Sequence, residues 1–363
     1  MTEPVKTTPL NKQHRNLGAL MAPFGGWDMP IQYEGIIAEH RWCREQAALF
    51  DICHMGEFHF KGDIVSSGLE DLFTFSIKAI PEGRSKYGFL LNEKGCIVDD
   101  LIVFRLADDE VMIVVNAATA PNDFKVIKSR LTTGQLSDIT ANTAKLDLQG
   151  PLSREVLVEL LGEWVSGIPY FRFVEHDLLG SPAIVSRTGY TGELGYEIFL
   201  PADKVVELWD ILLKDDRVKP AGLGARDVLR LEMGYSLYGN DIDETTTPLE
   251  ADLGAFVKLD KQFVGNEALL SEKNKLSGRI KVPFRVTSRR TPRHGFGIYD
   301  GDKKIGEVTS GVFSPMLGCG IGLGYVETAY SALDTVLSIR QDRTTMDAVV
   351  CSLPFYDKGS LRS

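Results

Sequence analysis

The chain has 363 residues, of which 44% are hydrophobic and 25% charged, a composition typical of a globular protein with two or three domains. Its formal net charge of -10 argues against a nucleic-acid partner, because nucleic-acid-binding proteins usually present a basic surface. No apolar leader and no apolar run of membrane-spanning length occurs, so we expect no signal peptide, no membrane span and a cytoplasmic location. A mitochondrial location would require that a transit peptide had been removed.

The cysteines do not suggest a disulfide framework or a metal site. The chain contains five cysteines, an odd number, with no CxxC pair and no Cys/His spacing typical of zinc ligands. We therefore expect reduced cysteines and no bound metal.

The first third of the chain begins with a turn-rich segment at residues 24–30, whose Trp27 either belongs to a functional loop or simply packs that loop down. Residues 36 to about 50 lack Pro and Gly and favour a helix. Residues 51–60 alternate between apolar and polar side chains, which indicates a strand.

Residues 87–104 read as a β-hairpin, because turn residues separate two apolar runs. Its returning strand carries Asp99 and Asp100, which must point to opposite faces. We place Asp100 on the apolar face, where a charge costs several kcal/mol unless it is paired or used. Three apolar residues define that face: Val98, Ile102 and Phe104. Asp100 is therefore the catalytic candidate, although a water-exposed face or a structural Arg partner would also explain it.

A second informative stretch covers residues 185–200, where three glycines lie between two short apolar runs and predict a strand, a tight loop and a strand. Alternation in the second strand separates Glu197 from its apolar neighbours. Glu197 either faces solvent or accepts N–H donors from a flat heterocycle. In the second case Tyr190 would supply an aromatic wall and Arg187 a charge.

Further along, a glycine-rich turn precedes a helix over residues 225–235. Arg226 shares an apolar helical face with Leu229 and Met233, and a buried arginine usually has a carboxylate partner or a ligand. Past about residue 277 short alternating strands and frequent glycines predict a small all-β domain.

Seven motifs then occur in a characteristic order: FGGWDMP, FDICHMG, GCIVDDLIVF, SRTGYTGELGYE, GLGARDVLRLEMGY, YGNDIDE and TSGVFSP. Together they resemble the aminomethyltransferase family, the T-proteins of the glycine cleavage system. The resemblance implies an α+β fold in which three domains form a ring around a central folate channel. The sheets would be mixed or antiparallel, and the last domain would be all-β, like a jelly roll or barrel.

The resemblance also implies a division of the chain. The first domain would comprise residues 1–54, about 137–155 and 240–275. The second would comprise about 55–136 and 156–239, and the β domain would comprise 276–363.

The implied reaction transfers a one-carbon unit from the aminomethyl group on the dihydrolipoyl arm of H-protein to tetrahydrofolate. The implied partners are lipoylated H-protein and tetrahydrofolate, with no metal, flavin, nicotinamide, nucleic acid or membrane. Asp100 would be the catalytic carboxylate. The folate-binding residues would be Glu197, Arg226, Tyr190, Tyr235, Tyr170 and Arg362. Cys53 stands where the family commonly has Ser, and Cys96 where a second Gly is common.

Two other readings remain open. A tetrahydrofolate-dependent demethylase of the same fold would keep the folate residues but need no H-protein. A non-catalytic folate-binding factor would carry a lysine-glycine-cysteine run, whereas this chain has Gln262 where that cysteine would stand. The complete set of motifs favours the aminomethyltransferase.

Overall fold

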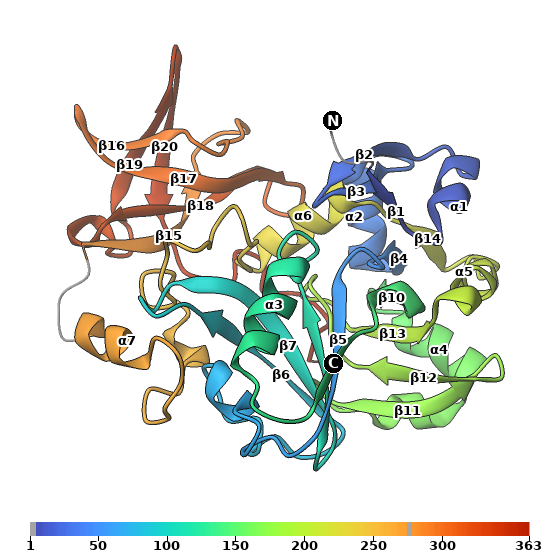
Figure 1. The fold of residues 1–363 in the computed structure, drawn as a ribbon. Helices are drawn as coiled ribbons and strands as arrows, with labels where there is room; N and C mark the ends of the chain where they lie inside the picture. The colour runs from blue at the N-terminus through green and yellow to red at the C-terminus, as the bar shows by residue number, and fades with distance from the viewer. Residues whose placement is uncertain (1–4, 274–277, 363) are drawn as a thin grey trace.

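The computed structural model describes residues 5–273 and 278–362, and in this part of the chain the strands form three open sheets and one closed barrel (Figure 1). No helix in these two ranges is long and apolar enough to cross a membrane. The mixed α+β architecture with a C-terminal barrel confirms the predicted fold class.

The N-terminal segment forms a small sheet with the order β1-β3-β2. Its strands and the helices beside them are β1 (Lys6–Thr7), α1 (Asn11–Asn16), β2 (Leu20–Phe24), β3 (Trp27–Gln32) and α2 (Ile36–Glu45). Gly25 and Gly26 have positive φ angles of 55° and 85°, which a tight turn between β2 and β3 requires. Trp27 therefore lies at the start of a strand, immediately after this turn.

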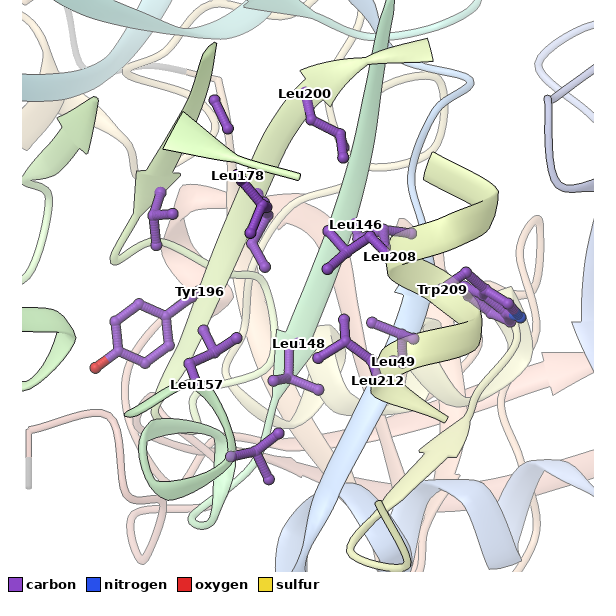
Figure 2. Packing of buried hydrophobic residues seen from close by; sticks show 14 of the residues in the cluster. Leu49, Leu146, Leu148, Leu157, Leu178, Tyr196, Leu200, Leu208, Trp209 and Leu212 are labelled. Atoms are coloured by element: carbon purple, nitrogen blue, oxygen red, sulfur yellow. The ribbon is translucent and has the colours of Figure 1, made fainter. Parts of the chain in front are cut away.

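A six-stranded sheet with the order β11-β12-β13-β10-β4-β14 forms the second layer. Its strands are β4 (Ala47–Asp51), β10 (Thr143–Gln149), β11 (Phe173–Leu178), β12 (Ser181–Ser186), β13 (Gly195–Pro201) and β14 (Val218–Pro220). Helices α4 (Ser153–Leu161) and α5 (Val205–Leu212) contribute to the core on one of its faces. Figure 2 shows Leu208, Trp209 and Leu212 of α5 beside the leucines of β10 and β4.

The alternation predicted for β13 is confirmed. Tyr196, Ile198 and Leu200 belong to this core, whereas Phe199 packs in a separate cluster on the opposite face. Glu197 consequently lies on the face of the sheet away from α4 and α5.

A five-stranded antiparallel sheet has the order β6-β7-β8-β5-β9. Its strands are β5 (Gly56–Lys61), β6 (Arg84–Leu91), β7 (Ile97–Ala107), β8 (Glu110–Val115) and β9 (Gln135–Asp138), and α3 (Ala120–Arg130) packs on its core. The predicted hairpin is confirmed as β6 and β7.

The C-terminal domain is a closed barrel with the order β15-β18-β17-β16-β19-β20. Its strands are β15 (Arg279–Val286), β16 (Gly297–Asp300), β17 (Lys303–Ser314), β18 (Cys319–Glu327), β19 (Val336–Gln341) and β20 (Thr344–Val350). Helix α7 (Asn266–Lys273) precedes it, and α6 (Leu223–Glu232) contacts α2 and β3 on one side and β17 and β18 on the other (Figure 1). Helix α6 thus lies between the barrel and the N-terminal sheet.

One predicted element boundary is wrong. The helix expected to reach about residue 50 ends at Glu45, and after Gln46 the residues Ala47–Asp51 form the buried strand β4. Pairing of β4 with β10 and β14 outweighs the local helix preference of its alanines. The strand expected over residues 51–60 is correspondingly confined to β5.

The strands of the predicted second domain are divided between two sheets. Residues 56–138 supply the five-stranded sheet, whereas β11, β12 and β13 pair with β10 and β4 in the six-stranded sheet. Sheet pairing therefore does not follow the predicted boundary, and the division into a first and second domain stays a prediction.

Candidate functional site

Asp100 on β7 is held by two neutral donors. The Tyr87 hydroxyl donates to Oδ2 at 2.9 Å, and the Asn116 amide donates to Oδ1 at 2.8 Å. Burial raises the pKa of this carboxyl above its usual range, and these two hydrogen bonds partly oppose the shift. Within residues 5–273 and 278–362 no Lys or Arg forms an ion pair with Asp100. This excludes a structural Arg partner as the explanation for its position.

The faces of β7 differ from the predicted pattern at one residue. The pairing of β6 with β7 shifts register at Val98, so Val98 joins the core of Leu101 and Val103 instead of lying with Asp100. Asp99 is the more deeply buried carboxylate, with no exposed surface, whereas Asp100 is only half-buried. A bulge of this kind leaves no clear signal in an alternating sequence.

Glu197 on β13 pairs directly with Asp147 on the neighbouring strand β10. The Thr188 hydroxyl donates to Glu197 Oε2 at 2.5 Å, and the side chain is 8% exposed. Asp147 is fully buried and accepts a hydrogen bond from Arg226 Nη1 at 2.5 Å. Burial raises the pKa of Asp147 to about 7; Arg226 opposes this shift, and the neighbouring Glu197 charge adds to it.

Arg226 reaches this pair from the first turns of α6. The helix approaches β3 so closely at Gly222 that a Cβ atom there would meet the Ile31 carbonyl carbon at 2.3 Å. Only glycine allows this approach, which brings the Arg226 guanidinium against Asp147. Of the two alternatives predicted for Arg226, a carboxylate partner or a ligand, the structure contains the carboxylate partner.

Tyrosines form the aromatic part of the site. The rings of Tyr190 and Tyr235 are stacked with centroids 5.6 Å apart, and the Arg226 guanidinium lies 5.1 Å from the Tyr190 centroid. Tyr170 is hydrogen-bonded to Tyr235, and the charges of Glu197 and Arg362 both act on it. The pKa of Tyr190 is raised mainly by burial, with Asp100 among the charges that contribute. These interactions bring all seven predicted site residues into one neighbourhood, which we call the polar cluster: Asp100, Tyr170, Tyr190, Glu197, Arg226, Tyr235 and Arg362.

The C-terminal segment is tied to the glycine loop between β12 and β13. The Ser360 N–H donates to Glu193 Oε2 at 2.7 Å, and the Leu361 N–H donates to the Gly192 carbonyl at 3.3 Å. Arg187 donates to the carbonyl of Leu361 at 3.2 Å and thus helps to hold this segment. Arg362 follows directly and is exposed.

Sequence reasoning missed three residues that organise the site. Tyr87 and Asn116 hold Asp100, and Asp147 holds Arg226. The position of Asn116 at the end of an apolar strand was the only signal for it. Apolar and polar residues alternate regularly along residues 143–149, and Asp147 occupies one of the polar positions. No local pattern therefore distinguishes it from a solvent-facing residue.

Among the described side chains, no three His, Cys, Asp or Glu residues converge in a way that could hold a metal ion. A hollow of about 170 Å³ borders β6 at Arg84 and Lys86, and another of about 310 Å³ lies between α4 and α5. Neither hollow includes a residue of the polar cluster.

The fold matches a solved structure and two domain families of the T-protein class. The crystal structure of glycine cleavage system aminomethyltransferase T from Bartonella henselae superposes with a TM-score of 0.91 at 35% identity, covering 98% of this chain and 99% of that chain. Residues 10–261 match the GCVT N-terminal domain, and residues 279–357 match the glycine cleavage T-protein C-terminal barrel domain.

Curated relatives match this chain along almost its whole length. A protein of Thermotoga sp. (strain RQ2) named aminomethyltransferase is 41% identical over 363 residues, covering 99% of both chains. A protein of the same name from Halothermothrix orenii is 42% identical over 358 residues, covering 97% of this chain and all of the relative. The chain belongs to the aminomethyltransferase family, the T-proteins of the glycine cleavage system.

Proposed function

We propose that the chain transfers a one-carbon unit from the aminomethyl group on the dihydrolipoyl arm of H-protein to tetrahydrofolate. The products are 5,10-methylenetetrahydrofolate, ammonia and dihydrolipoyl H-protein. Family membership supports the reaction class. The observation that carries the assignment to this site is a carboxylate, Asp100, held by two neutral donors beside stacked tyrosines and a buried Arg–Asp pair.

The polar cluster suits a pterin. Glu197 uses Oε2 to accept from Thr188, and among the described residues no donor is bonded to its other oxygen, which is therefore available to the adjacent N–H groups of a pterin. Arg226 uses Nη1 for Asp147, so its remaining N–H groups suit the pterin carbonyl. Tyr190 and Tyr235 offer ring surfaces to the flat heterocycle.

The opposite end of the substrate requires a positive charge. The glutamate part of folate carries carboxylates, and Arg362 is an exposed arginine beside Tyr170 and Tyr235. In this arrangement the pterin would lie between Glu197 and Arg226, and the glutamate would extend toward Arg362.

Asp100 would act on the reacting nitrogen. One folate nitrogen attacks the aminomethyl carbon as ammonia leaves, and the second folate nitrogen then displaces the dihydrolipoyl sulfur from the same carbon. Each attacking nitrogen loses a proton, and one proton must reach the leaving nitrogen and one the leaving sulfur. Burial raises the pKa of Asp100, which makes it a better proton acceptor than a solvated aspartate. Tyr87 and Asn116 fix the carboxylate so that it is oriented before the substrate arrives.

The test supplies purified protein with tetrahydrofolate and aminomethylated H-protein and measures methylenetetrahydrofolate and ammonia. We expect both products in equal amounts, and neither when H-protein carries no aminomethyl group. Folate binding without H-protein-dependent turnover would replace the proposal with the demethylase. Absence of folate binding would exclude both enzymes.

A further inference from the structure

Behind Asp100 two more carboxylates are buried against each other. Asp99 on β7 and Asp123 on α3 both have no exposed surface. Their carboxyl groups lie within hydrogen-bonding reach of each other, with Thr119 close to Asp123. The Thr119 hydroxyl donates to the Asn116 carbonyl at 3.1 Å, and in the described part of the chain neither oxygen of Asp123 accepts a hydrogen bond. The contact between these two side chains is therefore the feature that needs a physical explanation.

Asn116 connects this pair to Asp100. Its main-chain N–H donates to Asp99 Oδ2 at 2.9 Å, and its side-chain amide donates to Asp99 Oδ1 at 2.8 Å. The same amide nitrogen donates to Asp100 Oδ1 at 2.8 Å. Asp99 thus fixes the orientation of the Asn116 amide, and the amide in turn donates to Asp100.

Two ionised carboxylates in contact away from water repel each other strongly unless a cation neutralises them. No Lys or Arg forms an ion pair with Asp99 or Asp123 within the described ranges, and the charge of Lys281 acts on Asp100. Burial raises the pKa of Asp123 to about 7 and raises that of Asp99, to which the Asp123 charge adds. The other titratable groups that act on the pair are Tyr87, Asp100, Tyr238 and Glu244.

We propose that Asp99 and Asp123 share one proton and that this acid pair is a positioning device, which holds the Asn116 amide in the orientation that fixes Asp100. The shared proton converts a repulsive contact into a hydrogen bond between β7 and α3. Asp99 and Asp123 do not touch the substrate and act only through Asn116. The catalytic part of the inference rests on the proposed function, whereas the shared proton does not.

The first test detects the proton directly. Infrared difference spectra at about pH 6 compare the protein with Asp123→Asn and with Asp203→Asn, an exposed aspartate used as the control. We expect Asp123→Asn to lose the absorbance of one protonated carboxyl group and the control to keep it, while the bands of other buried carboxyl groups such as Asp147 are present in all three proteins. Identical spectra of Asp123→Asn and the unchanged protein would overturn the shared proton.

The second test separates positioning from bulk structure. Asp123→Asn supplies the bridging proton from its amide, so it should retain turnover, whereas Asp123→Ala should lower kcat about tenfold, the effect of one weakened charged hydrogen bond. Folate affinity should be unchanged in both variants because neither residue lies in the polar cluster. Unchanged kcat in Asp123→Ala, or loss of kcat in Asp123→Asn with its fold intact, would overturn the positioning role.

The two tests also distinguish failures. If neither the unchanged protein nor any variant releases methylenetetrahydrofolate, the proposed function is contradicted, while the infrared result still decides whether the proton is shared.

The pH dependence of stability gives a third criterion. Because the folded pKa is raised, the proton stabilises the fold most at low pH, and stability falls as pH rises from about 4 to about 7. Asp123→Asn should flatten this dependence, and an unchanged slope would count against the shared proton.

Discussion

Replacing Glu197 with Gln tests the pterin site without removing volume. The side chain keeps its length and can still accept from Thr188, but the charge that would hold the pterin N–H groups is lost. A hydrogen bond to a charged group contributes about 1.5 to 3 kcal/mol, so folate affinity should fall roughly tenfold to a hundredfold.

The fold should not suffer from this change. The Glu197 charge raises the pKa of both Asp147 and Glu57, which means that it repels two buried carboxylates. Removing it relieves this repulsion, so the free energy of unfolding should stay the same or increase. Weaker folate binding in Glu197→Gln would therefore not be a consequence of unfolding.

The assay is calorimetric titration of tetrahydrofolate into each protein, combined with denaturant unfolding. Glu207→Gln on the exposed side of α5 is the matched control, since it makes the same chemical change away from the polar cluster. Equal dissociation constants for Glu197→Gln and the control would refute the role given to Glu197.

Two further variants test the supports of the site. Arg226→Met leaves Asp147 buried without its partner and should cost on the order of 3 to 5 kcal/mol of unfolding free energy. The folded pKa of Asp147 is already raised and would rise further, so the loss should be larger near pH 8 than near pH 5, where Asp147 can protonate; urea unfolding with equal losses at both pH values would contradict this. Glu193→Gln weakens the charged contact with Ser360 and should raise KM for tetrahydrofolate through Arg362 while leaving kcat nearly unchanged; steady-state kinetics showing an unchanged KM would refute this anchoring.

Much of the fold follows from local sequence patterns. The alternation of β13, the β6–β7 hairpin and the glycine-punctuated C-terminal strands are local signals, and each corresponds to an observed element. Strand β4 was mistaken for helix because its partners lie about a hundred residues or more away along the chain. Local propensity carries no information about such pairing.

The site shows the same limit at the level of side chains. Asp100 and Arg226 stand out because each is a charge on an otherwise apolar face, Glu197 stands out because it follows the glycine-rich loop on the face away from its apolar neighbours, and the motif order supports all three. Their partners do not stand out, because Tyr87 and Asn116 acquire a role only when β6, β7 and β8 are aligned. Asp99 shares its face of β7 with Leu101 and Val103, which lie in the core of the five-stranded sheet, and the alternating pattern does not encode which face of the strand other elements cover.

The most direct test of the central claim is single-turnover transfer with Asp100→Asn, measured as methylenetetrahydrofolate formed from aminomethylated H-protein. The carboxamide keeps the shape of the side chain but cannot accept a proton, so the rate should fall about 10²- to 10⁴-fold, the usual contribution of general acid–base catalysis. Folate affinity, measured by calorimetry on the same sample, should remain close to that of the unchanged protein. A transfer rate within a few fold of the unchanged protein would contradict the role of Asp100 and the account built on it.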